Sequence, residues 1–138
     1  GGPGAMQKAP RYGEVVRDVA ALRAHRREAA LVAGIGFDRI VLDPGIGFGK
    51  SVDHNLALLA RQRELVSLGS PLLVGWSRKT TLGTLTGRSV DQRLHASVAA
   101  ALIAVERGAR IVRVHDVAAT VDALKVWCAT IAPEERTP

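Results

Sequence analysis

Cysteine is almost absent from this sequence of 138 residues, in which Cys128 is the only one. A single cysteine cannot form a disulfide within the chain, which favours a reducing compartment. No apolar run is long enough to span a bilayer. The start of the chain, residues 1–4, also lacks the basic residues and the apolar stretch of a signal peptide. We therefore expect a cytoplasmic protein with no membrane partner.

Aromatic side chains are also scarce, at 4% of the residues, whereas hydrophobic residues make up 47%. Val, Leu, Ile and Ala must therefore build the core, and the length is that of one domain. The formal net charge is +6, but Arg17 and Arg23 share a segment with Glu14 and Asp18. Such mixing is typical of a solvated helix face, and no basic stripe carries aromatics that stack on bases. We expect no nucleic-acid partner, and the positive charge also suits an enzyme with anionic substrates.

A glycine-rich stretch, DPGIGFGKS at residues 43–51, ends like a phosphate-binding P-loop. The P-loop pattern G-x-x-x-x-G-K-[ST] needs a glycine at position 44, where this chain has Pro44, which has no N–H to donate to phosphate. The dinucleotide pattern G-x-G-x-x-G also fails, because its third glycine would fall on Lys50. The stretch is therefore not a nucleotide-binding loop, and its glycines need another explanation.

Helices and strands alternate in the sequence pattern. Buried strands are expected at 38–43, 71–76 and 109–116, with helices at 14–32, from 51 or 53 to before Gly69, at 91–107 and at about 118–129. The helix at 91–107 should turn Leu94, Val98, Ala101, Leu102 and Val105 inward. Residues 1–13 are typical of a loop, and residues 133–138 of a frayed tail. Strands separated by helices predict a parallel sheet and an α/β fold class.

Polar residues follow the carboxyl end of each expected strand. They are Asp43 with its glycine loop, residues 77–80, and Arg113 with His115. Because the carboxyl ends of parallel strands meet at one edge, the pattern predicts one pocket built from three strand ends. Asp-Pro-Gly is also a turn sequence, so a turn is the alternative for Asp43. Phe48, on a glycine-rich loop, suits the covering of a flat substrate.

Two cations and two hydroxyls stand at the start of a helix in Ser77, Arg78, Lys79 and Thr80. Cations are unfavourable at the positive end of the helix dipole, which indicates an anion or polar ligand nearby, with a solvated turn as the alternative.

A second cationic pair lies in the last strand, where Arg113 and His115 alternate and so face one side. Such a pair suits a phosphate or diphosphate, with a core position as the alternative for His115. The other histidines have no metal-ligand spacing and the chain has one cysteine, so we expect no zinc site.

Three strands are too few for an eight-stranded barrel, which needs roughly 200 residues or more. The chain is therefore either a small α/β domain or the C-terminal part of something larger. Four stretches decide between these: LDPGIGFGK, the pair His54-Asn55, PLLVGWSRKTTLG and RIVRVHDV. Together they closely resemble the C-terminal half of the bacterial dihydropteroate synthase family, the folate-pathway enzymes that sulfonamides block. The resemblance runs from about Gly2 to Trp127 and implies that residues 1–138 are the C-terminal part of a pterin-binding (β/α)₈ barrel, with about three parallel strands and flanking helices.

The resemblance implies a transferase reaction. This reaction joins 6-hydroxymethyl-7,8-dihydropterin diphosphate to p-aminobenzoate and gives dihydropteroate and diphosphate, assisted by Mg²⁺. By this resemblance Asp43 and Lys79 would hold the pterin, while Arg113 and His115 would grip the diphosphate. Lys79, Arg113 and His115 would be the catalytic residues, because stabilising the departing diphosphate favours cationic character at the carbon that the amine attacks.

The p-aminobenzoate site is implied in the same way. Phe48 would line its slot, and Thr80 would meet its carboxylate with Arg78 close by. Ser77 completes the expected set of substrate-binding residues.

The resemblance also implies parts that this chain lacks. These are the first five strands, including an Asn for Mg²⁺ and diphosphate and an Asp and an Asn for the pterin. We therefore expect Mg²⁺ to have no protein ligand in this chain. We also expect exposed apolar strand edges, self-association or a homodimer, and little or no activity of the chain alone.

Two other functions stay open at this stage. One is a pterin- or folate-binding methyltransferase domain, which shares the barrel and the pterin-facing aspartate. The other is a non-catalytic α/β interaction module. The segment 77–79 and the pair Arg113 and His115 favour the synthase, because only the synthase must expel diphosphate.

Overall fold

The computed structural model describes residues 12–131 of the chain, so the predictions for residues 1–11 and 133–138 lie outside it. The helices are α2 (Tyr12–Val32), α3 (Val52–Ala60), α4 (Gln62–Val66), α5 (Thr80–Thr86), α6 (Leu94–Glu106) and α7 (Val117–Ala129), with 3₁₀ turns η1 (Phe37–Arg39) and η2 (Val90–Gln92). The strands are β1 (Leu73–Val74) and β2 (Ile111–Val112). Among the described residues, no helix combines the length and the apolar character needed to cross a membrane.

The strands are parallel, as predicted, but shorter than the sequence pattern indicates. β1 pairs with β2, with Leu73 opposite Ile111 and Val74 opposite Val112. The first predicted strand, 38–43, reduces to one parallel bridge between Leu42 and Leu72. Its start is not extended because residues 37–39 form the turn η1. The three predicted strand segments therefore lie side by side in chain order, joined by helices, which confirms the α/β class.

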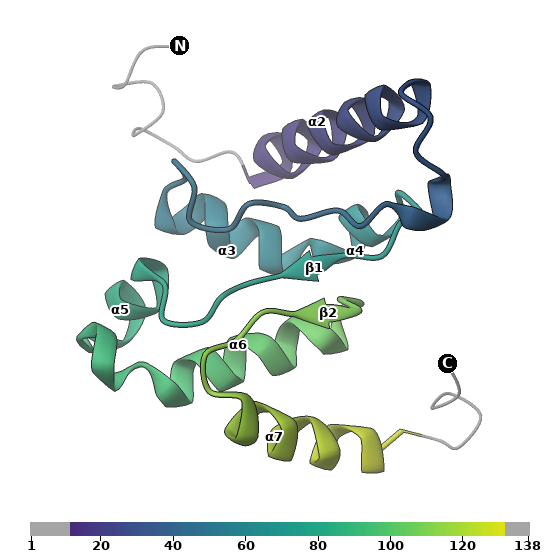
Figure 1. Ribbon diagram of the computed structural model, residues 1–138. Coiled ribbons are helices and arrows are strands. Elements are labelled where there is room, and N and C mark those ends of the chain that lie inside the picture. The colour runs from purple at the N-terminus through teal and green to yellow at the C-terminus, as the bar shows by residue number, and fades with distance from the viewer. Residues whose placement is uncertain (1–11, 132–138) are drawn as a thin grey trace.

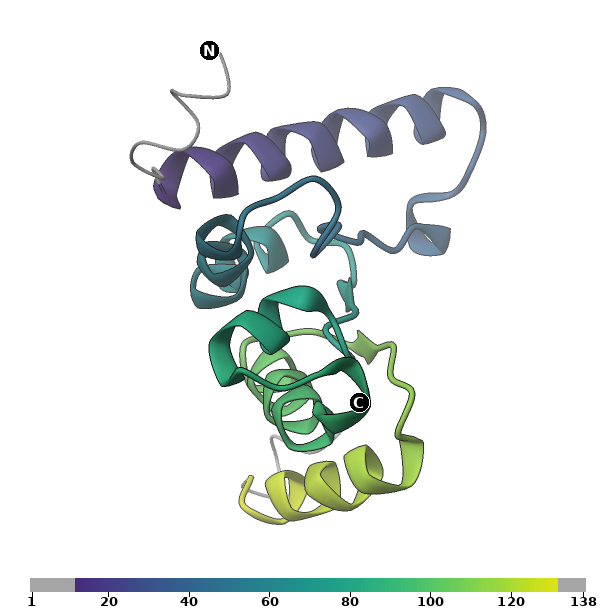
Figure 2. The same cartoon turned by 90° about the vertical axis from the view of Figure 1, so that its left-hand side faces the viewer.

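The helices lie mainly to one side of these strands. Figure 1 shows α2 at one end of the molecule and α7 at the other, with the strands between them. In Figure 2, α3, α4 and α6 lie on the same side of β1 and β2. On the strand segments, Val41 is 46% exposed and Ile111 is 43% exposed. The described chain thus leaves apolar side chains of its strands open to solvent, as expected for a sheet that is not closed into a barrel.

The core lies between the strands and the helices. Leu42, Leu72 and Val74 are buried together with Leu58 of α3 and Leu65 of α4. Ser51 begins this helical layer, because its Oγ accepts a hydrogen bond from the His54 backbone N–H at 3.1 Å. Ser51 is thus the N-cap of α3, which selects the first of the two helix starts that the sequence pattern allows.

Helix α6 packs through small residues rather than through the larger ones that the sequence pattern favours. Its buried residues are Ser97, Ala100, Ala101 and Ala104. Leu94, predicted to face inward, is exposed, whereas Ala101 is buried as predicted. Small side chains let the helix backbone approach its neighbours closely. The sequence prediction used only the spacing of apolar residues, so it did not take this close approach into account. Helix α2 likewise begins at Tyr12, two residues inside the predicted loop.

Replacing Leu65 by Ala tests this core. Leu65 is 1% exposed, so the cavity left by Leu65→Ala should lower the free energy of unfolding by about 2–5 kcal/mol. Urea unfolding followed by the fluorescence of the buried Trp76 measures the loss. Leu85→Ala is the matched control because Leu85 is 54% exposed, and its change should stay within about 0.5 kcal/mol. Equal losses in the two variants would contradict the core described above.

Candidate functional site

Asp43 lies where the first strand segment ends, and its two carboxylate oxygens have different partners. Oδ1 accepts a hydrogen bond from the Gly45 backbone N–H at 2.8 Å. Oδ2 lies 3.7 Å from Nη1 of Arg113, which comes from the end of β2. The first contact forms the turn that the Asp-Pro-Gly sequence indicates. The second joins two of the predicted strand ends, and both side chains stay about half exposed.

The loop after Asp43 depends on its glycines. Gly45, Gly47 and Gly49 have φ values of +73°, +89° and +66°, a left-handed region that glycine enters without strain. Lys50 closes the loop, because its Nζ donates to the Gly45 carbonyl at 2.9 Å. The glycines therefore allow the loop to fold back on itself. This structural role accounts for the glycines of the stretch that resembles a P-loop.

Asn55 is a site residue to which the sequence pattern assigns no role. It is buried on α3, where its Oδ1 accepts from the Gly47 backbone N–H at 2.9 Å. Its Nδ2 donates to Thr81 Oγ1, also at 2.9 Å. One amide thus ties the glycine loop to the first turn of α5. The signal that could have found it is a polar residue on the apolar face of a helix, next to the buried stretch 57–59.

Lys79 contacts two residues of the glycine loop, Ile46 and Phe48. The Lys79 ammonium donates a hydrogen bond to the Ile46 carbonyl. It also lies 5.2 Å from the centroid of the Phe48 ring, within the range of a cation–π contact. Phe48 is 71% exposed, so it is not a core residue, as the sequence predicts. Its ring is available to cover a ligand.

Ser77 and His115 join the ends of the other two strands. Ser77 Oγ lies 2.8 Å from Nδ1 of His115, and the backbone N–H of His115 donates to the same oxygen at 3.2 Å. Ser77 is buried, whereas His115 is exposed. The structure thus brings the predicted residues Ser77 and His115 into direct contact.

Arg78 and Thr80 lie on either side of Lys79. Arg78 has φ +58°, rare for a residue other than glycine, and its backbone N–H donates to Ser97 Oγ at 2.9 Å. Its Nη2 lies 3.3 Å from Asp116 Oδ1. Thr80 is the first residue of α5 and is exposed. Backbone strain of this kind often occurs where a structure holds side chains for function.

A cleft of about 540 Å³ opens between the glycine loop and the start of α5. Four cations line it, Lys50, Arg78, Lys79 and Arg93, together with the ring of Phe48, and none of the described residues in its wall is acidic. Asp43, Arg113 and His115 do not line this cleft. This cleft therefore covers only the Lys79 side of the expected site, and a single pocket built from three strand ends stays a prediction.

The electrostatics of the site favour a negatively charged ligand. Burial is the main cause that lowers the pKa of Lys79 below its ordinary value, followed by the positive charge of Arg113, while Asp43 acts in the opposite direction. The pKa of Lys50 is lowered first by burial and then by Arg23, again opposed by Asp43. An anion placed here would relieve the repulsion among these cations.

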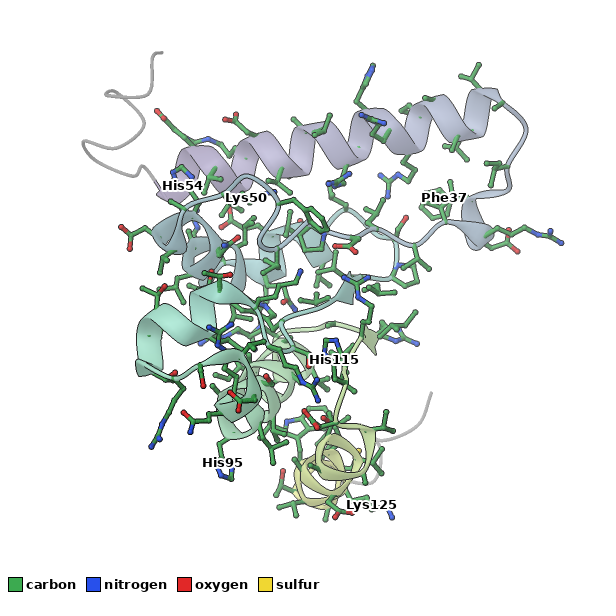
Figure 3. All side chains as sticks on the ribbon, turned by 60° about the vertical axis from the view of Figure 1, so that its left-hand side comes forward. Phe37, Lys50, His54, His95, His115 and Lys125 are labelled. Carbon is green, nitrogen blue, oxygen red and sulfur yellow. The ribbon has the colours of Figure 1, made fainter. Side chains whose placement is uncertain are left out.

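The site does not have the composition of a metal centre. Within residues 12–131, no three side chains of His, Cys, Asp or Glu lie together in a way that could hold a metal ion. Figure 3 shows His54, His95 and His115 on separate parts of the molecule. The expectation that Mg²⁺ has no protein ligand in this chain stays a prediction, because Mg²⁺ is often held by only one or two carboxylates together with substrate phosphates.

Parallel α/β proteins bind their ligands at the edge where the carboxyl ends of the strands meet, and this chain gathers cations at that edge. A family model described as pterin binding enzyme matches residues 1–115 of the chain. The chain therefore belongs to the pterin-binding enzyme family, as the resemblance of its motifs predicts.

Individual relatives agree with this assignment. The chain is 51% identical over 130 residues to the dihydropteroate synthase of Haemophilus influenzae, covering 94% of this chain and 47% of that protein. The crystal structure of dihydropteroate synthase from Stenotrophomonas maltophilia with active site-bound imidazole matches with a TM-score of 0.84 at 53% identity, over 100% of this chain and 51% of that one. The Xanthomonas albilineans enzyme in complex with 7,8-dihydropteroate also gives a TM-score of 0.84, at 50% identity over 94% of this chain and 48% of that one.

The chain thus spans about half the length of the relatives that it matches. Its fold is part of a (β/α)₈ barrel, as predicted. The roles of the individual site residues stay predictions.

Removing Arg113 tests the electrostatics of the site. In Arg113→Ala the pKa of Lys79 should rise toward its ordinary value of 10.5, because a neighbouring positive charge is gone. A pH titration of the Lys79 side-chain NMR signals measures it, with Arg110→Ala as the control for an exposed arginine in the same segment. An unchanged Lys79 titration would contradict the coupling.

The same shift has a consequence for stability. Because the folded state binds the Lys79 proton less tightly than the unfolded state, the free energy of unfolding should increase with pH between the folded pKa and 10.5. This increase should be smaller in Arg113→Ala.

Proposed function

We propose that this chain is the C-terminal part of a dihydropteroate synthase, which condenses 6-hydroxymethyl-7,8-dihydropterin diphosphate with p-aminobenzoate. The observation that carries the proposal is the exposed pair Arg113 and His115 at the end of β2, with Lys79 nearby and Asp43 3.7 Å from Arg113. Arginine and histidine donors on one strand suit the two phosphate groups of a leaving diphosphate. The solved structure of the Xanthomonas albilineans relative with 7,8-dihydropteroate supports the same product.

The pterin would lie at Asp43 and Lys79. A carboxylate accepts hydrogen bonds from the amino-pyrimidine edge of a pterin, and an ammonium group donates to the ring atoms that accept them. The proximity of both residues to Arg113 supports this placement, because it sets the pterin next to the diphosphate that it carries.

The cleft beside the glycine loop would hold p-aminobenzoate. Phe48 offers an apolar ring for the flat substrate, while Arg78, Thr80 and the start of α5 offer donors to its carboxylate. The four cations in the wall of the cleft support an anionic occupant. A sulfonamide, which imitates p-aminobenzoate, would compete for the same space.

In the reaction, the bond between the pterin methylene carbon and the diphosphate oxygen breaks, and a bond from that carbon to the amine nitrogen forms. The amine loses one proton. Arg113 and His115 would stabilise the negative charge that develops on the departing diphosphate, which lowers the barrier to bond breaking. Any Mg²⁺ would take its protein ligands from outside the described residues. We further propose that residues 1–138 alone catalyse the reaction slowly or not at all, because they span about half the length of their relatives.

We also propose that the protein works as a homodimer in the cytoplasm. Helix α7 supports self-association, because Val117, Val121 and Val126 are exposed along it. The single cysteine supports a reducing compartment.

Calorimetry with the pterin diphosphate tests the proposal. Arg113→Ala should weaken binding by about tenfold or more, the cost of one charge-assisted hydrogen bond, whereas Arg110→Ala should not. The corresponding pterin alcohol, which carries no diphosphate, should bind both variants equally. If the pterin diphosphate binds Arg113→Ala as tightly as the unaltered chain, the synthase assignment fails. Such a result would favour the alternative function, a pterin- or folate-binding methyltransferase domain.

A further inference from the structure

The parallel register of the two strands continues beyond their hydrogen-bonded residues. Leu73 faces Ile111 and Val74 faces Val112, an offset of 38 residues. The same offset sets Gly75 opposite Arg113 and Ser77 opposite His115. The Arg113 backbone N–H donates to the Val74 carbonyl at 3.0 Å, so the ladder reaches this far. Each residue of the anion-binding pair therefore has one cross-strand neighbour on the β1 side.

Gly75 provides room for the Arg113 guanidinium. Gly75 is not among the glycines with positive φ, so its backbone conformation does not require glycine. A Cβ at this position would lie 2.8 Å from Nη2 and 3.1 Å from both Cζ and Nε of Arg113, and these are the nearest atoms around it. The guanidinium thus lies against the bare backbone of Gly75, and a methyl group there would push it away.

Ser77 lies where its hydroxyl can select which nitrogen of His115 carries the proton. A hydroxyl has one hydrogen to donate and two lone pairs. One lone pair of Ser77 Oγ accepts a hydrogen bond from the His115 backbone N–H. Ser77 Oγ also lies 2.8 Å from Nδ1 of the His115 ring. Since Ser77 is buried, its hydrogen needs an acceptor, and Nδ1 provides one. Nδ1 is then unprotonated, and in the neutral ring the proton resides on Nε2.

Nε2 lies on the side of the imidazole ring away from Ser77, and His115 is exposed. Figure 3 shows His115 near the strand ends, at the centre of the molecule. A protonated Nε2 donates toward solvent, where an anion beside Arg113 would accept it.

We propose that Gly75 and Ser77 are positioning residues for a diphosphate-binding pair. Gly75 sets the place of the Arg113 guanidinium, and Ser77 fixes His115 in the form that donates from Nε2. This inference rests on the proposed function, because it concerns the same anion site. It also gives Ser77 a different role from the direct substrate contact that the sequence predicts.

The first test reads the tautomer directly. Nitrogen-15 NMR spectra of the ring of His115, recorded at a pH where the ring is neutral, should show a protonated Nε2 and an unprotonated, hydrogen-bonded Nδ1. In Ser77→Ala the two nitrogen shifts should move toward each other as the tautomers interconvert, and Ser77→Thr, which keeps the hydroxyl, should restore them. The matched control is Ser70→Ala, which removes another buried serine, one that bonds to Arg27 instead. An unchanged His115 spectrum in Ser77→Ala would overturn the role of Ser77.

The second test measures the binding of inorganic diphosphate by calorimetry. Ser77→Ala should weaken it about fivefold, the typical effect of one lost hydrogen bond. Gly75→Ala should weaken it by about tenfold through the displaced guanidinium. The free energy of unfolding should change little in Gly75→Ala, because only the end of a flexible side chain must move.

The two proposals fail in different ways. If Arg113→Ala binds diphosphate as tightly as the unaltered chain, the anion site itself is wrong. If Arg113→Ala weakens binding while Gly75→Ala leaves the affinity unchanged, the anion site stands and the role of Gly75 is overturned.

Discussion

The parallel register between β1 and β2 is the constraint on which the site depends. It sets Leu73 opposite Ile111, and because side chains alternate along a strand, every second residue beyond that pair faces the same side. A shift by one residue would turn Arg113 and His115 away from Gly75 and Ser77. The register is held by burial, since Val74 of β1 and Leu72, just before β1, are almost completely enclosed. The packing of a small apolar core thus decides the chemistry at the strand ends.

The second feature of the site is its positive charge. The charged ammonium groups donate mainly to backbone carbonyl oxygens. Lys79 donates to the Ile46 carbonyl and Lys50 to the Gly45 carbonyl. These contacts fix the two ammonium groups in place without neutralising them, and Asp43 is the carboxylate that acts on both. Donors fixed in this way bind an anion with little reorganisation, which is how a protein stabilises charge that develops during a reaction.

Sequence reasoning placed the candidate site residues at the strand ends better than it described their surroundings. Alternating helices and strands were enough to place Asp43, Lys79 and Arg113 at strand ends, because a parallel sheet brings those ends to one edge. The role of Asn55 was missed because its partner Thr81 is 26 residues away, and helical periodicity identifies a buried face but not its contacts. The shape of the cleft was also missed, because it depends on how a glycine loop folds back rather than on any residue pattern.

The half-exposed contact between Asp43 and Arg113 is the weakest part of the site in the described chain. At 3.7 Å and open to water, such a pair contributes little to stability. The same charges interact far more strongly where protein replaces water around them, because the effective dielectric constant falls. Val41 and Ile111, exposed on the strand segments, are the kind of surface that further strands would cover. In a chain of the relatives' full length, that cover would bury these apolar side chains and would strengthen the proposed attraction of Arg113 for a diphosphate. The stability of the barrel and the affinity of the proposed site would then depend on the same contacts.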